Sequence, residues 1–311
     1  MIEIKNLSKT YESSGTRSLD GITMNVKDGS VLGLIGTNGA GKSTLLRILA
    51  GIYRQDEGEV LIDGQEVFDN NSVKSTIAYI SDDQLFLPSS TLGDMSRFYA
   101  NLYRNYSAES FDRLVKEFGL DPNRKVNTFS KGMRRQGEVI LALSICPKYL
   151  LCDETFDGLD PIMREFAAGK IMSEVARRGM TVILSSHNLR EMEQFCDGMA
   201  LIHGGKLLIN KSIDEMRDNI YRCQAVFTGE AALDGVIDAH SVKRTGKLVS
   251  FIATGTAEEL EAKVKTAAER SLCSVTYFEA LPLTLEEMFS YELNSRGLNK
   301  LIYKELTEDV G

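Results

Sequence analysis

The feature that most constrains this sequence is a glycine-rich segment, Gly36–Thr44, which reads GTNGAGKST. It follows the apolar run Val31–Ile35 and leads into the helical run Lys42–Ala50, so the chain passes from a buried strand through a tight loop into a helix. Glycines permit the positive φ angles and the close backbone approach that such a loop needs. This order of elements predicts a parallel α/β sheet.

The first 210 residues continue this alternation of short apolar runs and helical stretches. The predicted strands are Val31–Ile35, Ile77–Ile80, Tyr149–Cys152, Thr181–Leu184 and Met199–Ile202, and Pro161–Arg178 is predicted to be a helix. A segment at about 85–145 interrupts the alternation with the helical stretches Leu92–Asn101 and Ala108–Phe118 and no strand between them. We therefore expect residues 1–210 to form an α/β domain with an inserted helical subdomain.

The pattern changes after residue 210. It predicts strands at Gln224–Phe227, Val236–Lys243, Leu248–Ala253 and Ser274–Phe278, and helices at Ala257–Arg270 and Leu285–Leu293. Residues 211–311 are therefore expected to form a small α+β domain. No internal repeat or heptad series is present, which excludes a solenoid or a coiled coil.

Composition limits the classes of partner and compartment. The chain has 36 basic and 44 acidic residues and a net charge of −8, so it lacks the positive field that nucleic-acid binding uses. Five scattered cysteines without a CxxC pair favour a reduced, intracellular protein. The most apolar run, Val139–Cys146, is far shorter than the roughly 20 residues that cross a bilayer, and the charged N-terminal segment does not resemble a secretion signal.

The glycine-rich segment fits the pattern G-x-x-x-x-G-K-[ST], which binds nucleotide phosphates. Backbone N–H groups turn inward around a phosphate, and the helix start adds partial positive charge. Lys42 is expected to reach the β- and γ-phosphates, and the Ser43 hydroxyl to ligate Mg²⁺. The residues assigned to nucleotide binding in this loop are Gly36, Asn38, Gly39, Gly41, Lys42, Ser43 and Thr44.

A second motif is the apolar run Lys148–Cys152, which ends in the adjacent carboxylates Asp153 and Glu154. Asp153 is expected to hold Mg²⁺, directly or through water, and Glu154 to polarise an attacking water as general base. A strand-end carboxylate pair by itself is more often a solvated loop edge or a helix cap. The phosphate loop in the same chain favours catalysis.

Four further segments resemble motifs of the ATP-binding cassette (ABC) transporter ATPases, in the order of that family. Phe129–Gln136 is similar to the signature motif, Gly158–Pro161 to the D-loop and Ser185–His187 to the switch histidine segment, and Tyr11 lies where the family stacks an aromatic ring on adenine. The resemblance covers residues 2–210. It implies an ATPase that binds ATP and Mg²⁺.

The resemblance also implies a head-to-tail dimer, expected here to be a homodimer. Ser130 and Gly132 would contact the γ-phosphate bound to the second copy, Asp160 would connect the two active sites, and His187 would hold the attacking water. Each residue type has a simpler reading, since a serine before a helix is commonly an N-cap, a strand-end histidine can be a satisfied loop residue and Tyr11 can be core packing.

The sequence departs from the family pattern at several positions. Asp82 stands where the family has a glutamine that contacts Mg²⁺ and the attacking water, and Gln84 is the alternative for this role. Lys131, Met133 and Thr155 replace a glycine, a glutamine and a proline. None of these changes removes a group that the reaction requires, so we expect an active site with Asp82 as a catalytic and metal-contacting residue.

Without a membrane-spanning segment, a transporter ATPase must act on a separate permease, expected to dock near the Asp82 loop and the helical subdomain at the cytoplasmic face of the membrane. The signature and the segment Pro282–Phe289 resemble bacterial exporter ATPases for drugs or for antimicrobial or toxic peptides. The alternatives are a soluble ABC-fold ATPase acting on ribosomes or DNA, and a catalytically silent partner of a heterodimer, in which Glu154 or His187 would be missing.

Overall fold

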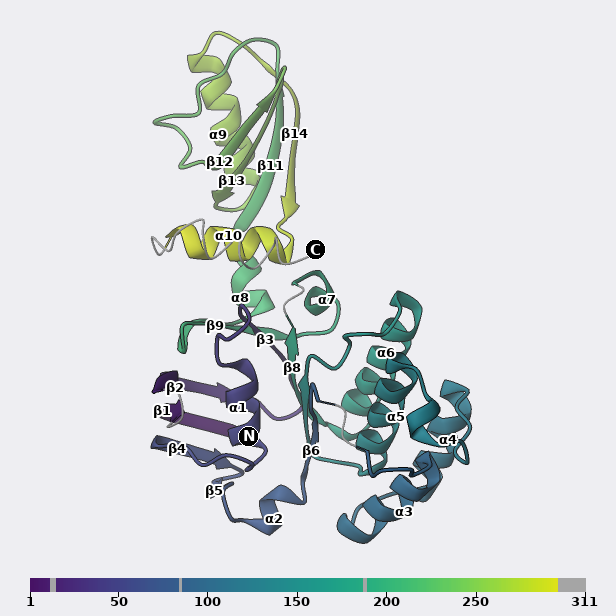
Figure 1. Cartoon of the computed structure of the whole chain (residues 1–311). Helices are drawn as coiled ribbons and strands as arrows, with labels where there is room; N and C mark the ends of the chain where they lie inside the picture. The colour runs from purple at the N-terminus through teal and green to yellow at the C-terminus, as the bar shows by residue number, and fades with distance from the viewer. Residues whose placement is uncertain (12–14, 84–85, 187–188, 296–311) are drawn as a thin grey trace. The chain divides into compact units, whose positions relative to one another are not determined.

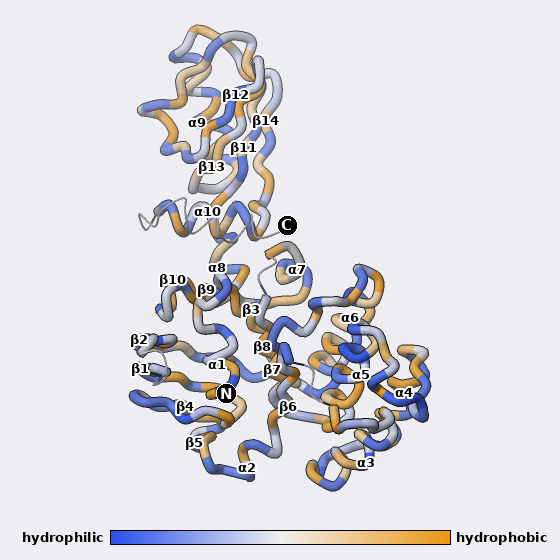
Figure 2. The backbone as a smooth tube through the Cα atoms, in the orientation of Figure 1, coloured by the Kyte–Doolittle hydropathy of each residue, from blue (hydrophilic) through white to orange (hydrophobic). Residues whose placement is uncertain are grey.

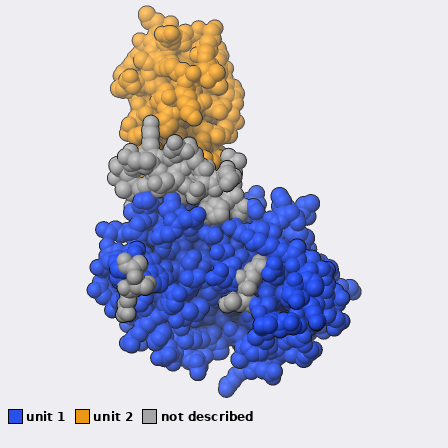
Figure 3. Space-filling model, in the orientation of Figure 1, with its two compact units in different colours: residues 1–210 blue, residues 211–311 orange. Residues whose placement is uncertain are grey.

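The computed structural model describes residues 1–11, 15–83, 86–186 and 189–295 (Figure 1). The chain divides into two compact units, Met1–Asn210 and Lys211–Gly311, which Figure 3 shows in separate colours. Within the described ranges, every helix is too short or too polar to cross a bilayer.

The larger sheet of the first unit has six strands in the order β10-β9-β3-β8-β7-β6. Their bounds are β3 Val31–Ile35, β6 Ile77–Ile80, β7 Tyr149–Asp153, β8 Thr181–Ser186, β9 Gly198–His203 and β10 Lys206–Ser212. Strand β3 pairs in parallel with β8 and β9, and β7 pairs in parallel with β6 and β8. Every residue of β3, β7 and β8 is buried, which explains their continuous apolar runs. The predicted α/β class is confirmed.

A second, antiparallel sheet was not predicted from the sequence. Its order is β2-β1-β4-β5, with β1 Ile2–Tyr11, β2 Thr16–Val26, β4 Glu57–Ile62 and β5 Gln65–Glu66. Its longer strands place apolar residues on one face and charged or polar residues on the other, as in β2, where Ile22, Met24 and Val26 are buried between exposed neighbours. This alternation is weaker in a hydropathy scan than the solid apolar runs of the parallel strands.

Helix α1 (Lys42–Leu49) lies between the two sheets (Figure 1). Its Leu45, Leu46 and Leu49 are buried in one core with Ile4 of β1 and Leu151 of β7. In Figure 2 the apolar residues of α1 and the strands beside it are orange. Because α1 is packed from both sides, the glycine-rich loop at its start has a defined place at the carboxyl end of β3.

The helical segment of the first unit packs beside the parallel sheet. It contains α3 Leu92–Leu102, α4 Ala108–Phe118 and α5 Lys131–Ser144, and α5 packs against α3, α4 and the following helix α6, Pro161–Arg178. Thr91 and Asp94 form a capping box at the start of α3. The bounds of α4 and α6 agree with the predicted ones. Short helices complete the unit at α2 Asn71–Lys74, η1 Val126–Thr128 and α7 Leu189–Glu193.

The second unit contains an antiparallel sheet in the order β12-β13-β11-β14. Its elements are α8 Ile213–Arg217, β11 Ile220–Phe227, β12 His240–Thr245, β13 Leu248–Thr254, α9 Ala257–Arg270, β14 Val275–Pro282 and α10 Leu285–Ser295. Leu260 and Val264 of α9 pack into one core with the sheet residues Cys223 and Phe251. Strand β12 does not begin at Val236 as predicted, because Val236 N–H donates to the carbonyl of Leu233 in a turn.

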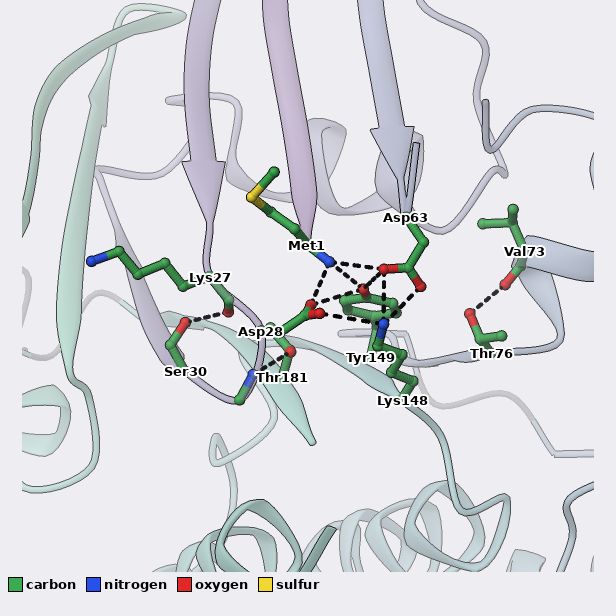
Figure 4. A network of polar contacts seen from close by, with 11 residues as sticks. Met1, Lys27, Asp28, Ser30, Asp63, Val73, Thr76, Lys148, Tyr149 and Thr181 are labelled. Atoms are coloured by element: carbon green, nitrogen blue, oxygen red, sulfur yellow. Dashed lines mark hydrogen bonds and ion pairs between the residues drawn. The ribbon is translucent and has the colours of Figure 1, made fainter. Parts of the chain in front are cut away.

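A polar network joins the turns at one end of the antiparallel sheet to β7 (Figure 4). The phenol of Tyr149 hydrogen-bonds to Asp28 at 3.0 Å and to Asp63 at 2.7 Å, and Lys148 Nζ lies 2.8 Å from Asp63. The Met1 amino group also donates to Asp63, at 2.9 Å. Partial burial alone would raise the pKa of Asp63, but hydrogen bonds from Lys148, Met1 and Tyr149 outweigh it and lower the pKa.

This network predicts an acid-sensitive contribution to stability. A carboxyl group with a lowered pKa stabilises the fold above its unfolded-state pKa of about 3.9, and that contribution is lost as the pH falls below it. We expect Asp63→Asn to lower the free energy of unfolding by about 1 kcal/mol at neutral pH and by less as the pH falls toward about 3. Urea titrations at several pH values measure this. Glu66→Gln on β5 is the control, and a pH-independent difference would contradict the assignment.

Candidate active site

The glycine-rich loop is held tightly against neighbouring backbone. Gly41, just before α1, has a φ of 112°, and a Cβ there would lie 2.5 Å from the carbonyl oxygen of Ser18. A Cβ on Gly36 would lie 2.4 Å from the carbonyl oxygen of Ile202. Only glycine fits at either position without moving the backbone, so the two glycines set the path of the loop.

Lys42 points its ammonium group into the loop. Its side chain is 4% exposed, and Nζ donates to the carbonyl oxygens of Gly36 at 2.7 Å and Thr37 at 3.3 Å and lies 3.7 Å from a carboxylate oxygen of Glu154. Burial lowers the pKa of Lys42, while the carboxylates of Glu154 and Asp153 oppose the shift. An ammonium group in this position is suited to an anion that enters the loop.

Asp153 is fully buried at the carboxyl end of β7. Its Oδ1 accepts hydrogen bonds from Ser43 at 3.0 Å and Ser185 at 2.8 Å, and its Oδ2 accepts one from Tyr79 at 3.1 Å. Three hydroxyls from three different elements therefore orient one carboxylate. The arrangement places Ser43 and Asp153 together as predicted.

The oxygen groups of Ser43 and Asp153 fit Mg²⁺. Among the described residues, no group of three His, Cys, Asp or Glu side chains could hold a metal ion by itself. Mg²⁺ is commonly bound by one or two carboxylates together with water and substrate phosphates rather than by a complete protein cage. The donor set is therefore suited to an ion that arrives with a phosphate ligand.

Glu154 follows in a strained backbone conformation. Its φ of 46° lies in the left-handed region, which is uncommon for a residue with a side chain, and its N–H donates to Ser185 Oγ at 3.0 Å. The turn separates the directions of the two carboxylates, so that Asp153 is buried and Glu154 is 20% exposed. Glu154 is therefore open to a water molecule in the cavity.

Lys42, Ser43 and Glu154 line a cavity of about 460 Å³. The residues predicted from the sequence that line it are Tyr11, Asn38, Gly39, Gly41, Lys42, Ser43, Thr44, Asp82 and Glu154. The phenol of Tyr11 lies 2.9 Å from Thr44 Oγ1. The fold thus brings residues from β1, the glycine-rich loop, the end of β6 and the end of β7 to one site.

The remaining predicted residues lie elsewhere or outside the described ranges. Ser130 and Asp160 accept hydrogen bonds from Met133 N–H and Met163 N–H as the N-caps of α5 and α6. Gly132 lies close to Gly158, since a Cβ on Gly132 would be 3.0 Å from the Gly158 carbonyl oxygen. His187 and Gln84 fall outside the residues that the structure describes.

Sequence reasoning missed Tyr79 and Ser185 as site residues. Both lie at or near the carboxyl ends of strands beside β7, and that position is the signal that could have identified them. Burial, followed by the charge of Asp153, raises the pKa of Tyr79 to about 12. The phenol therefore stays protonated and donates to Asp153 over the physiological pH range.

The chain is similar to several known proteins over most of its length. The profile of the family described as "ABC transporter" matches residues 19–157. The chain is 32% identical to the lantibiotic transport ATP-binding protein SrtF of Streptococcus pyogenes, over 73% of this chain and 98% of SrtF. It is 30% identical to the methionine import ATP-binding protein MetN of Haemophilus ducreyi, over 70% and 67% of the two chains. A solved structure described as the ATP binding subunit of an ABC transporter superposes with a TM-score of 0.64 at 29% identity, covering 70% of this chain and 92% of the other.

The contact between Tyr79 and Asp153 predicts a change in metal dependence. Tyr79→Phe removes the hydroxyl group that donates to Asp153 Oδ2. Loss of a residue that hydrogen-bonds to a metal ligand commonly costs about 10- to 100-fold in metal affinity or activity. We expect the Mg²⁺ concentration for half-maximal ATP hydrolysis to rise about 10-fold. A magnesium titration of the ATPase rate tests this. Tyr103→Phe is the matched control, and equal titration curves for wild type and Tyr79→Phe would refute the role.

Proposed function

The chain belongs to the family of ABC transporter ATP-binding proteins, which hydrolyse ATP, and we propose that it drives transport by a separate membrane permease. The observation that carries the catalytic part of this proposal is the meeting of Lys42, Ser43, Asp153 and Glu154 at one site. Residues 1–210 are assigned to the nucleotide-binding domain, with a helical subdomain at about 85–145. Residues 211–311 are assigned to an accessory domain.

Each residue of the site receives a role that its position suits. The loop N–H groups and Lys42 bind the phosphates of ATP, and Tyr11 packs against the adenine ring. Bound Mg²⁺ supplies positive charge to the phosphates, with Ser43 and Asp153 as its protein ligands and Asp82 reaching it through water. Glu154 accepts the proton of the attacking water. His187 is proposed to hold that water.

We assign a dimer of two copies of this chain to the hydrolytic state. Ser130 and Asp160 are N-caps and do not line the cavity of their own chain, which leaves the helix start after Ser130 available to a phosphate of a second copy. Gly132 lies in the same turn and has no side chain to obstruct a γ-phosphate. ATP binding would close the dimer and hydrolysis would open it.

A second cavity supports the permease as partner. It has a volume of about 430 Å³ and is called here the aromatic groove; it is lined by Tyr53, Tyr79, Phe86, Tyr99, Tyr103 and Glu138, among others. Tyr99 and Tyr103 stack with ring centroids 5.8 Å apart, and Ile52, which also lines the groove, is 52% exposed. A groove with aromatic walls suits a short amphipathic helix of another protein. The chain would thereby lie at the cytoplasmic face of the membrane and touch the membrane only through the permease.

Export is the direction we favour, with drugs or antimicrobial or toxic peptides as cargo. The support is the resemblance of the signature and of Pro282–Phe289 to exporter ATPases, together with the similarity to SrtF. The similarity to MetN shows that the relatives of this chain also include an import protein.

The alternative is a soluble ABC-fold ATPase acting on ribosomes or DNA. Co-purification of a membrane-spanning protein supports transport, and co-purification of ribosomal RNA supports the alternative.

The assignment of Glu154 predicts a variant that binds ATP without hydrolysing it. Glu154→Gln keeps the size of the side chain but removes the base, so the ATPase rate should fall by at least about 100-fold. ATP should still bind and should convert the variant to a stable dimer, as measured by light scattering after size exclusion. Hydrolysis at the wild-type rate would refute the base, and a monomer with bound ATP would refute the dimer.

The aromatic groove predicts a variant that loses its partner. Tyr103→Glu places a charge among the aromatic walls, so a permease co-expressed with the chain should no longer co-purify in detergent. Tyr277→Glu, on the exposed surface of β14, is the matched control and should retain the permease. A thermal melt of each variant tests whether it is folded. Equal recovery of the permease with both would exclude the groove as its docking site.

A further inference from the structure

A buried arginine connects the start of α5 to the loop that carries Asp82. Arg135 lies one turn after the N-cap Ser130, and its side chain is fully buried. Its Nη1 donates to the carbonyl oxygen of Ser81 at 2.6 Å and its Nη2 to that of Asp82 at 3.1 Å. A guanidinium charge removed from water is costly unless it is paired, so these contacts restrain the loop strongly.

Two carboxylates neutralise the same guanidinium group. Glu138, on the next turn of α5, lies 3.0 Å from Nη1, and an oxygen of the Asp82 side chain lies 3.6 Å from Nη2. The planar guanidinium reaches both backbone carbonyls and both carboxylates at once, which the single ammonium of a lysine cannot reproduce. The contacts therefore depend on arginine rather than on positive charge alone.

The residues that contact Arg135 line two different cavities. Asp82 lines the cavity of the glycine-rich loop, whereas Ser81 and Glu138 line the aromatic groove. Arg135 thus lies in the wall between the two cavities and touches residues that face each of them. A shift of α5, or a change in the pairing of Glu138, would move the guanidinium group and therefore change its contacts with Asp82.

We propose that Arg135 is a positioning residue that holds Asp82 in the catalytic cavity and links its position to the occupancy of the aromatic groove. A partner helix in the groove that engages Glu138 changes the pairing of Arg135 and so the placement of Asp82. This inference rests on the proposed function, since it gives Asp82 a part in hydrolysis and the groove a partner. It assigns the link to a residue that touches neither nucleotide nor partner.

The test compares Arg135→Lys with Arg113→Lys, a conservative change at an arginine of α4 that is 47% exposed. Arg135→Lys should lower kcat about 10-fold with little change in the KM for ATP, as expected for loss of an outer positioning contact. Backbone amide exchange in the peptide that ends at Asp83 should become faster. Arg113→Lys should change neither quantity.

A double-mutant cycle separates positioning from a general structural role. If Arg135 acts through Asp82, Arg135→Lys should have no further effect on kcat in an Asp82→Ala background. The same loss of kcat in both backgrounds, or an unchanged kcat in Arg135→Lys alone, would overturn the inference.

Glu138→Gln provides a second variant in case Arg135→Lys does not fold. It retains the buried arginine and removes one carboxylate charge, and its effect on kcat should also disappear in the Asp82→Ala background. An additive effect would overturn the inference. Failure of the proposed function is distinguishable, because the wild-type chain would then show no magnesium-dependent hydrolysis of ATP at all.

Discussion

The buried carboxylate of Asp153 is the interaction on which the site depends. A polar group without exposure to water is tolerated only when hydrogen bonds replace its hydration, and the donors to Asp153 are Ser43, Ser185 and Tyr79. They come from the start of α1, the end of β8 and the end of β6. One carboxylate therefore ties the start of α1 to the carboxyl ends of β6 and β8.

Ser185 also determines the direction of the next residue. Its hydroxyl donates to Asp153, and its oxygen accepts the N–H of Glu154, so one side chain holds both ends of the turn after β7. This support stabilises the left-handed backbone at Glu154. The result is a pair of neighbouring carboxylates in different surroundings, one buried against hydroxyls and one open to the cavity.

The catalytic cavity and the aromatic groove share a wall built from β6 and the residues after it. Tyr79 lines the groove and donates to Asp153, while Arg135 bonds to the backbone of Ser81 and Asp82. Two sets of polar contacts therefore run through this wall. Rigid hydrogen-bonded contacts of this kind transmit displacement better than mobile side chains do, which makes the wall a suitable place for mechanical coupling.

The sequence by itself determined the features that depend on neighbouring residues: the glycine-rich loop, the buried strands of the parallel sheet, and helices such as Pro161–Arg178 and Ala257–Arg270, whose caps and apolar spacing are local. Only the tertiary structure revealed the antiparallel sheet and the contacts of Tyr79, Ser185 and Arg135. Those contacts join residues far apart in the chain, and the local sequence around a tyrosine, serine or arginine does not predict its hydrogen-bond partner. Burial decided their roles, because a buried charge or hydroxyl must find a partner wherever the fold supplies one.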